Sequence, residues 1–348
     1  MASKFRKRII VTGGAGFIGS NYLNYAVKKY PRELFINVDA LTYAADVRNI
    51  TVQDKKNYAF EKADICDRAT MTAIFEKYAP THLIHFASET HVDQSIIDPS
   101  LCVRTNVEGT NELLLLARDH KLSRFHLVST DEIYGELGRD DAPFTETSAY
   151  NPRNPYSASK ASAELLFTSY RNTFGLPGVI TRSSNNYGPR QDVTKLIPKF
   201  ITNLLQGKKV PLYAAGEHMR DWLYVDDNVR ALDLVFRKGR DGSIYNIGGS
   251  SEYTNLEVTK TLLRMLRKTE KEIEYVADRA GHDFRYALSS KKIGRELGWK
   301  PRVRFEDGIK KTILFYRRRR ASEMGKGNFH ISEPRSRKGT YKKRVERS

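Results

Sequence analysis

Tyr156 and Lys160 stand four residues apart in the segment NPYSASKAS, where an amphipathic pattern predicts a helix over 156–174. At this spacing the two side chains share one face of the helix. A nearby ammonium group favours an ionised phenol, so we expect Lys160 to lower the pKa of Tyr156 from about 10 and to make it a usable base near neutral pH. The same spacing occurs by chance in many helices, so the surrounding motifs decide its meaning.

Two acids follow a hydroxyl residue at the end of another predicted strand. Thr130, Asp131 and Glu132 come directly after the apolar run 124–129. Reversible oxidation of an alcohol needs the tyrosine and a cofactor, whereas two further carboxyl groups suit an additional proton abstraction and a leaving group that must be protonated. Elimination of water from a hexose requires both. The alternative is that the two acids cap a helix or bind solvent.

A glycine-rich turn lies near the N-terminus. Gly13, Gly16 and Gly19 separate the β-branched run 8–11 from an amphipathic stretch. The first glycine allows a tight turn, the second lets the backbone approach a pyrophosphate, and the third permits close packing of helix on strand. Asp39 ends the next predicted strand, where a carboxylate accepts hydrogen bonds from an adenosine ribose and repels a 2′-phosphate. The pattern predicts a dinucleotide site that favours NAD over NADP.

Strand-like runs alternate with helical patterns through the first half of the chain, which predicts a parallel sheet covered on both faces. The runs lie at 8–11, 34–39, 58–60, 82–86, 124–129 and 177–182, and the helical patterns at 68–78, 105–120 and 156–174. Ligands of such sheets bind beyond the carboxyl ends of the strands, where the strand order reverses. After residue 182, turn-rich pieces mix with helical patterns at 194–206, 226–238, 255–268 and 304–320.

We therefore expect an α/β fold: a Rossmann-type doubly wound parallel sheet with a smaller, loop-rich α/β substrate lobe. The expected units are an NAD-binding domain over 1–182 plus about 218–248, a lobe over about 183–217 and 249–320, and a tail over 321–348. His82, His85 and His126 fall on strand segments and are interpreted as packed core residues. No spacing of His or Cys predicts a metal site.

The composition of the 348-residue chain narrows the class of protein. The formal net charge is +18, and twelve Lys and Arg against three Glu give 317–348 a charge of +9, half of the total. This end of the chain is predicted to be a solvated, disordered tail. The remainder is only mildly basic, which removes the composition argument for a nucleic-acid-binding fold. No apolar run approaches the ~18 residues of a membrane span, and two cysteines, Cys66 and Cys102, fit a reducing cytoplasm.

Together the motifs resemble the extended short-chain dehydrogenase/reductase family, and within it the nucleoside-diphosphate-glucose 4,6-dehydratases, most closely those that act on dTDP-glucose. The matching segments, from residue 8 to about 316, are VTGGAGFIGSN, VDALTYA, ADICD, ETHVDQSI, STDEIYG, NPYSASKAS, SNNYGP, KLIPKFI, RDWLYVDD, YNIGG, DRAGHDFRYA and KIGRELGWKP. Gln94 and Phe284 stand where the family commonly has arginine. Relatives that act on UDP- or CDP-glucose share much of the catalytic set, so the base stays open.

The resemblance implies NAD-dependent dehydration of dTDP-glucose to dTDP-4-keto-6-deoxyglucose. Tyr156 would take the proton of the carbon-4 hydroxyl, Glu132 the hydrogen at carbon 5, and protonated Asp131 would donate to the departing carbon-6 hydroxyl, with Thr130 orienting the substrate. The residues implied for the cofactor are Gly13, Gly16, Phe17, Ile18, Gly19, Asp39, Asp64, Ile65, Tyr156 and Lys160. Those implied for the nucleotide sugar are Thr90, Asn185, Lys195, Pro211, Tyr213, Arg220, Asn255, Arg279 and His282.

Other interpretations remain open for several of these features. Asp64 is either an adenine contact or a strand-end cap. The same scaffold supports sugar-nucleotide epimerases and decarboxylases, against which the Asp131–Glu132 pair argues. A non-catalytic binding protein, with the basic tail on nucleic acid or an anionic membrane, is a further alternative. The family's usual homodimer would pair the helices predicted at 105–120 and 156–174.

Overall fold

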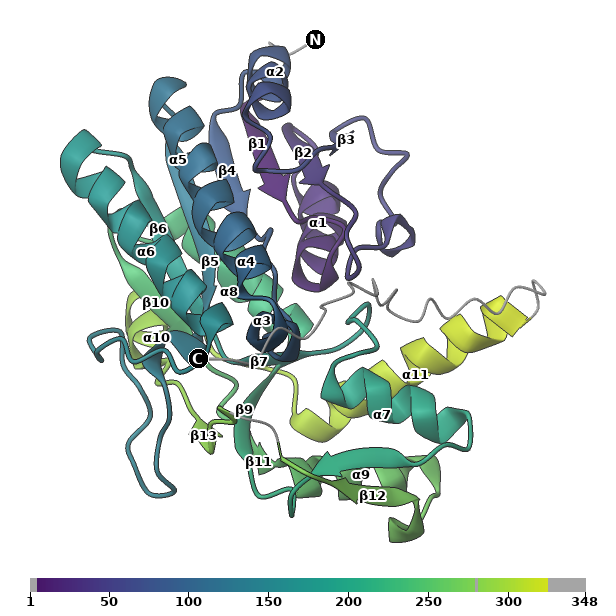
Figure 1. Ribbon diagram of the computed structural model, residues 1–348. Coiled ribbons are helices and arrows are strands. Elements are labelled where there is room, and N and C mark those ends of the chain that lie inside the picture. The colour runs from purple at the N-terminus through teal and green to yellow at the C-terminus, as the bar shows by residue number, and fades with distance from the viewer. Residues whose placement is uncertain (1–4, 279–280, 325–348) are drawn as a thin grey trace, which may run out of the picture.

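The main sheet consists of parallel strands in the order β10-β6-β5-β4-β1-β2-β3 (Figure 1). The computed structural model describes residues 5–278 and 281–324, and it contains these strands as β1 (Lys7–Thr12), β2 (Glu33–Asp39), β3 (Tyr58–Lys62), β4 (His82–His85), β5 (Arg124–Thr130), β6 (Gly178–Ser183) and β10 (Ile244–Ile247). The order reverses between β1 and β4, which is where such sheets bind ligands. The predicted doubly wound α/β fold is confirmed.

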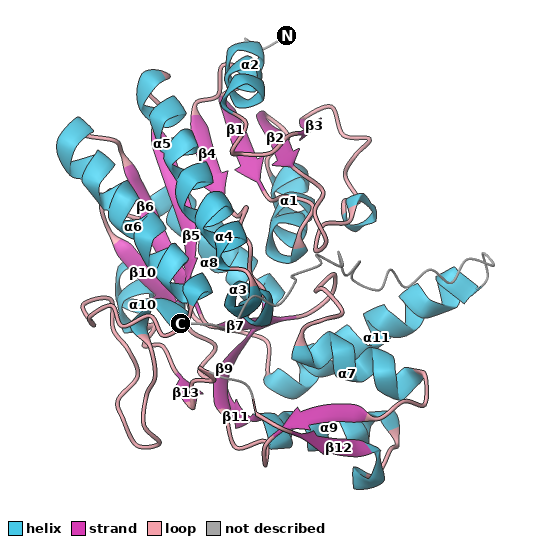
Figure 2. Ribbon diagram, viewed as in Figure 1, coloured by secondary structure: helices cyan, strands magenta, loops and turns pink. Residues whose placement is uncertain are grey.

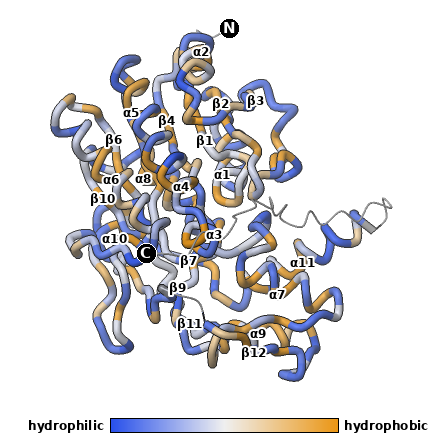
Figure 3. Tube along the Cα trace, in the orientation of Figure 1, coloured by the Kyte–Doolittle hydropathy of each residue, from blue (hydrophilic) through white to orange (hydrophobic). Residues whose placement is uncertain are grey.

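Helices cover both faces of this sheet (Figure 2). The helices α1 and α8 share one buried cluster with the strands, and α2, α5 and α6 share the other. Their bounds are α1 (Phe17–Lys29), α2 (Arg68–Tyr78), α5 (Gly109–Asp119), α6 (Pro155–Phe174) and α8 (Val225–Lys238). Hydrophobic and hydrophilic residues alternate along these helices, as Figure 3 shows, because each helix buries one side against the sheet.

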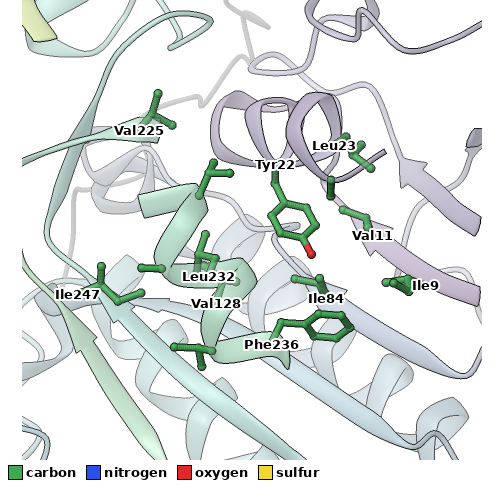
Figure 4. Packing of buried hydrophobic residues seen from close by; sticks show 14 of the residues in the cluster. Ile9, Val11, Tyr22, Leu23, Ile84, Val128, Val225, Leu232, Phe236 and Ile247 are labelled. Carbon is green, nitrogen blue, oxygen red and sulfur yellow. The ribbon is translucent and has the colours of Figure 1, made fainter. Parts of the chain in front are cut away.

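The central strand β1 is apolar over Ile9–Val11 because both faces of the sheet are buried there, whereas the edge strand β3 is only partly buried. Along β1, Ile9 and Val11 face the cluster with α1 and α8, while Ile10 between them faces the opposite cluster. Figure 4 shows Tyr22 of α1 and Phe236 of α8 packed against the strand residues on the first face. Because successive side chains of β1 point to opposite clusters, β1 lies in the middle layer, between two layers of helices.

Local sequence sets where α6 begins, and with it the position of the expected catalytic tyrosine. Asn154 accepts a hydrogen bond from the backbone N–H of Ser157 (2.9 Å), and the Ser157 hydroxyl accepts one from the N–H of Asn154. Pro155 occupies the first helical position, where its missing N–H costs nothing. Gly175, with φ +69°, ends the helix. These signals place Tyr156 in the first turn, at the ligand-binding edge of the sheet.

A second cluster of elements follows β6 and forms the smaller lobe. It includes β7 (Asn185–Tyr187), β8 (Val210–Tyr213), β9 (Met219–Tyr224), β11 (Glu252–Thr254), β12 (Ile273–Val276), β13 (Arg285–Tyr286), α7 (Leu196–Leu205), α9 (Asn255–Leu266) and α11 (Phe305–Met324). In this lobe β9 pairs with β7, β11 and β13, and β8 pairs with β12. The three helices share one apolar core. No helix among the described residues has the length and apolar character needed to cross a membrane.

Several elements differ from the sequence-based expectation. The short strands β9 and β10 were not predicted. They overlap pieces of sequence that were predicted to be turn-rich, because polar residues interrupt their apolar pattern. The expected helix over 105–120 begins as a π-helix, η3 (Val103–Glu108), before α5. The shorter helices α3 (Val92–Ile97), α4 (Pro99–Cys102) and α10 (Lys291–Leu297) were not predicted.

The expected domain division stays a prediction, although some of its boundaries divide a helix or separate strands that pair in one sheet. The segment 218–248 was assigned to the NAD-binding domain, but its strand β9 pairs within the lobe, and only α8 and β10 lie with the main sheet. The helix α11 continues to Met324, so 321–324 are helical rather than part of a tail. The rest of the predicted tail lies outside the described residues.

Two of the strand histidines are buried as neutral rings. His85 is hydrogen-bonded to the hydroxyls of Thr12 (2.7 Å) and Thr110 (3.0 Å), and His126 to that of Thr181 (3.0 Å). Burial lowers the pKa of each ring from 6.5 to about 3. The expectation that these residues pack in the core is confirmed for these two, which are at most 1% exposed, whereas His82 at the start of β4 is only partly buried.

This burial makes stability depend on pH. Below about pH 6.5 the unfolded chain binds protons that the folded protein does not, so each histidine should lower the free energy of unfolding by about 1.4 kcal/mol per pH unit as pH falls. Urea unfolding between pH 7 and pH 5 measures the slope. The variant His126→Gln should flatten it by one histidine's share, whereas His120→Gln, at an exposed position, should keep the parental slope. Equal slopes in the parent and His126→Gln would contradict the account.

Candidate active site

A cavity of about 350 Å³ lies at the carboxyl ends of the main-sheet strands. Residues that follow each strand from β1 to β6 contribute to its wall. The sequence-predicted residues that line it are Gly13, Gly16, Phe17, Ile18, Gly19, Asp39, Asp64, Ile65, Thr90, Thr130, Asp131, Glu132, Tyr156, Lys160, Asn185 and Lys195. The structure therefore brings together the whole expected cofactor set, the expected catalytic residues and three of the expected substrate residues.

The glycine turn has little room for side chains where the backbone is tightest. Gly13 has φ +68°, and a Cβ there would lie 2.6 Å from the backbone N of Ala87. A Cβ on Gly19 would lie 2.3 Å from the carbonyl oxygen of Gly13. Gly16 caps α1 without any side-chain hydrogen bond to the first turn. The first N–H groups of α1 thus face the cavity with no side-chain acceptor, which suits the pyrophosphate of a dinucleotide.

Asp39 holds the turn against the next strand and faces the same cavity. Its carboxylate accepts hydrogen bonds from the backbone N–H groups of Ala15 and Leu41, both at 2.8 Å. Burial raises its pKa in spite of these two hydrogen bonds. The carboxylate oxygens have further lone pairs that can accept from ribose hydroxyls. The turn, the helix start and this acid fit NAD, and they would hold its phosphates and its adenosine ribose.

Asp64 caps the end of a strand, as one of its two interpretations predicts, and the adenine contact stays a prediction. Its carboxylate accepts from the backbone N–H of Cys66 (2.9 Å) and from the guanidinium of Arg104 (3.2 Å), so it caps the end of β3. It also lines the cavity beside Ile65.

Tyr156 and Lys160 are both buried on α6, with 7% and 5% exposure. The Lys160 ammonium donates to the carbonyl oxygen of Val128 (2.9 Å), and burial lowers its pKa to about 8. Burial, followed by the charge of Glu132, raises the pKa of Tyr156 well above 10, while a hydrogen bond with Thr130 acts in the opposite direction. The prediction that Lys160 lowers this pKa is wrong for this structure, because desolvation and a nearby carboxylate outweigh it.

Asp131 and Glu132 form the first turn of the short 3-10 helix η4 (Asp131–Tyr134), which Thr130 caps by accepting from the Glu132 N–H. Asp131 is 2% exposed. Burial raises its pKa well above 3.8, and the carboxylates of Glu132 and Asp221 raise it further. Burial and the neighbouring carboxylates therefore favour the protonated form of Asp131, the form that can donate a proton, while Glu132 beside it lines the cavity.

The expected substrate residues fall into two groups. Lys195 donates to the carbonyl oxygen of Thr90 (2.8 Å), and both lie at the cavity wall with Asn185. The second group belongs to the lobe and comprises Pro211, Tyr213, Arg220, Asn255 and His282, none of which lines the cavity. Arg279 lies outside the described residues.

Arg220 is the lobe residue of this set that lies near the proposed catalytic acid Asp131. Its charge is close enough to Asp131 to oppose the rise in that acid's pKa. Its guanidinium donates to the carbonyl oxygens of Met219 (2.7 Å), Asp283 (2.8 Å) and Phe284 (3.1 Å). In this structure it joins β9 to the segment before β13.

One group of side chains in the lobe could also hold a metal ion. Ligand atoms of His218, Asp278 and His282 all lie within 4.8 Å of one another. The Asp278 carboxylate lies 2.7 Å from His282 Nδ1 and 3.3 Å from His218 Nε2, so it can accept a hydrogen bond from each ring. These hydrogen bonds account for the grouping without an ion. This grouping could not be predicted from local spacing, because His218 is far from Asp278 and His282 along the chain.

Two buried networks support the site and were also missed. Arg182 on β6 pairs with Glu164 on α6 at 2.6 Å, with both side chains at most 1% exposed. Asn106, in the π-helix η3, accepts from the Glu89 N–H (2.8 Å) and donates to the Ser159 hydroxyl (2.8 Å). Glu164 falls four residues after Lys160, so sequence alone places the two on the same helix face. No other spacing in the sequence points to either network.

Comparisons with known proteins agree with this geometry. The family model for GDP-mannose 4,6 dehydratase matches residues 10–312. The dTDP-glucose 4,6-dehydratase of Salmonella typhimurium is 46% identical over 334 residues, which cover 89% of this chain and 92% of that protein. The structure of DesIV, a dTDP-glucose 4,6-dehydratase from Streptomyces venezuelae solved with NAD bound, has a TM-score of 0.87 and 44% identity over 90% of this chain and 98% of its own.

A solved epimerase shares the fold at lower identity. The UDP-glucose 4-epimerase of Thermotoga maritima has a TM-score of 0.84 and 32% identity, and the match covers 90% of this chain and 99% of that chain.

Replacing Gly13 tests the tight turn. We expect Gly13→Ala to weaken binding of NAD by at least about tenfold, or ~1.4 kcal/mol, because the new methyl group would displace the backbone of Ala87. Gly175→Ala is the matched control, since Gly175 has the same left-handed backbone (φ +69°) but nothing within 4 Å of its Cβ. The control should lose about 1–2 kcal/mol of stability and keep its affinity. Isothermal titration with NAD measures both, and equal affinities would contradict the role of the turn.

Proposed function

This chain belongs to the nucleotide-sugar 4,6-dehydratase family of extended short-chain dehydrogenases/reductases, and we propose that it converts dTDP-glucose to dTDP-4-keto-6-deoxyglucose with NAD as its cofactor. The relatives at about 46% identity are named dTDP-glucose 4,6-dehydratases. A structural neighbour of that name was solved with NAD bound. The observation that carries the proposal is the pair of adjacent carboxyl groups at the cavity wall, Asp131 at 2% exposure and Glu132 beside it.

In the proposed reaction Tyr156 removes the proton from the hydroxyl at carbon 4 as that carbon is oxidised to a ketone, a step that requires the phenol to ionise against the burial and the Glu132 charge that raise its pKa. NAD, when bound, supplies the hydride acceptor for carbon 4 and the hydride donor for carbon 6. Thr130 opposes the rise in the pKa of Tyr156 through its hydrogen bond, and the positive charge of the nicotinamide would favour the phenolate further when NAD is bound. Burial of Tyr156 and Lys160 keeps water away from the oxidised sugar.

The two acids divide the elimination between them. The ketone at carbon 4 acidifies the hydrogen at carbon 5, and Glu132 takes that proton. Asp131 donates its proton to the hydroxyl at carbon 6, which leaves as water. Glu132 returns its proton to carbon 5 when carbon 6 is reduced. Tyr156 has then gained one proton and Asp131 has lost one, so a single proton transfer resets the site.

The alternative functions, an epimerase or a dehydratase of another nucleotide sugar, would use the same scaffold. An epimerase needs the tyrosine and the cofactor, and a buried protonated acid has no role in that reaction. UDP- or CDP-glucose would undergo the same chemistry, since the base lies away from carbons 4 to 6. Incubation with dTDP-, UDP-, CDP- and GDP-glucose separates these substrates, and 4-keto product is expected chiefly from dTDP-glucose.

Removing the base at position 132 tests the assignment of roles. Glu132→Gln should lower the yield of dehydrated product by about 10²–10⁴-fold while still allowing oxidation at carbon 4. Mass spectrometry of the quenched sugar nucleotide separates oxidised sugar that keeps its carbon-6 hydroxyl from the dehydrated product. Glu274→Gln, on an exposed strand of the lobe, is the control and should behave as the parent. Full turnover by Glu132→Gln would sink the assignment.

We also propose a homodimer that pairs α5 and α6 with their copies. Leu165 and Phe174 on α6 are 57% and 52% exposed, an apolar surface that a second copy would cover. The proposed location is the cytoplasm, which the two unpaired cysteines support.

An acidic residue on this face should prevent the pairing. Sedimentation of the parent should give a dimer, and Leu165→Glu should shift it to a monomer because the charge would be buried without a partner. Tyr275→Glu, at a residue of the lobe that is 59% exposed, should leave the dimer intact. A dimer that survives Leu165→Glu would place the interface elsewhere.

A further inference from the structure

The segment that follows β2 forms part of the cavity wall. We call residues Leu41–Asn49 the nucleotide loop. Its members Thr42, Tyr43, Ala44 and Ala45 line the cavity. The loop is tied to the glycine turn at the carbonyl oxygen of Ala15, which accepts from the backbone N–H of Asp46 (3.1 Å) and from the side-chain amide of Asn49 (3.5 Å). A displacement of the nucleotide loop would therefore open the cavity next to the proposed phosphate site.

Two arginines from beyond β6 hold this loop from outside. Arg319, near the end of α11, donates to the Asp46 carboxylate at 2.6 Å. Arg190, between β7 and α7, donates to the carbonyl oxygen of Asn49 (3.1 Å) and to the Asn21 side chain of α1 (2.9 Å). Both contacts cross more than 100 positions of sequence, so neither follows from local structure.

Asp46 is built to receive this contact. Its other oxygen accepts from the backbone N–H of Arg48 (2.9 Å), which fixes the carboxylate at the start of a short helical turn. Burial opposes its ionisation, but hydrogen bonds from Arg48 and the charges of Arg48 and Arg319 outweigh burial and hold its pKa below 3.8. The side chains of Arg319 and Asp46 are 30% and 20% exposed. The oxygen that faces Arg319 (2.6 Å) also pairs with the guanidinium of Arg48 (2.8 Å), so Arg319 adds a second cation from α11 to an ion pair within the nucleotide loop.

The neighbours of Arg319 provide a contrast. Arg317 and Arg318 are exposed, and within the described part of the chain neither forms an ion pair. Of these three arginines, Arg319 alone forms an ion pair with the nucleotide loop within the described residues, at Asp46, which directly follows the cavity-lining Ala45.

We propose that Arg319 is a positioning residue that latches the nucleotide loop over the cofactor cavity and slows the release of NAD. This inference rests on the proposed function, in which the cofactor is regenerated in every turnover and has no need to leave. A latch on the loop would then retain the cofactor without limiting the rate of the reaction. An ion pair that is partly exposed is worth up to about 1 kcal/mol, which corresponds to a change in the release rate of about two- to fivefold.

Release of NAD from the loaded protein tests the latch without turnover. The protein is loaded with radiolabelled NAD, chased with excess unlabelled NAD, and sampled on filters. Arg319→Ala should release NAD about two- to fivefold faster than the parent, and Arg318→Ala, the matched control, should release it at the parental rate. Added salt should speed release from the parent and have less effect on Arg319→Ala, because it screens the ion pair.

A double-mutant cycle separates the latch from a general loss of structure. Asp46→Asn keeps the acceptor for the Arg48 N–H and removes the charge, and it should speed release as Arg319→Ala does. Because Asp46→Asn also removes the charge that pairs with the Arg48 guanidinium (2.8 Å), the double variant should release NAD no faster than Asp46→Asn alone. Additive effects, or a parental rate in Arg319→Ala, would contradict the latch alone. A parent that binds no NAD would contradict the proposed function and the latch together.

Discussion

The relative position of the proposed catalytic groups depends on one buried ion pair. Arg182 on β6 donates to both carboxylate oxygens of Glu164 on α6, at 2.6 to 3.1 Å. The same guanidinium donates to the hydroxyl of Tyr134 at the end of η4 (2.5 Å) and to that of Tyr150 (2.7 Å). Removing one partner of such a pair leaves a buried charge and costs about 3–5 kcal/mol. The interaction therefore holds the helix that carries the tyrosine and lysine against the turn that carries the two acids.

Burial at this junction also sets the protonation of each group. Asp131 lies near two other carboxylates, Glu132 and Asp221, and is cut off from solvent, so its pKa rises. Asp221 accepts hydrogen bonds from the backbone N–H groups of Gly249 and Ser251, and burial nevertheless raises its pKa to about 6. Neighbouring acids in unequal surroundings are what a division between proton donor and proton acceptor requires. The fold itself places these acids in unequal surroundings, before any ligand binds.

Local patterns in the sequence were sufficient for the nucleotide-binding half. The strands that precede Gly13 and Asp39 are apolar and buried on both faces, so their ends could be located from composition alone. The spacing of Tyr156 and Lys160 on one helix face also follows from helix geometry. The raised pKa of Tyr156 could not be foreseen, because it depends on burial and on a carboxylate contributed by a different strand end.

Contacts between distant segments were beyond the reach of sequence. The strand β9 carries Arg220 and Asp221 between its apolar residues, and its polar character reads as a turn until its three partner strands are known. The pairing of Arg182 with Glu164 and that of Arg319 with Asp46 join parts of the chain that share no periodic pattern. Sequence therefore identified which residues the cavity contains, and the structure identified what holds them in place.

The fate of the hydrogen at carbon 4 tests the central claim most directly. The protein would be incubated with NAD and with dTDP-glucose that carries deuterium at carbon 4, and the product examined by NMR. The account predicts dTDP-4-keto-6-deoxyglucose with the deuterium at carbon 6. A sugar that keeps its carbon-6 hydroxyl and differs only in configuration at carbon 4, or a product whose deuterium has been lost to solvent, would contradict it.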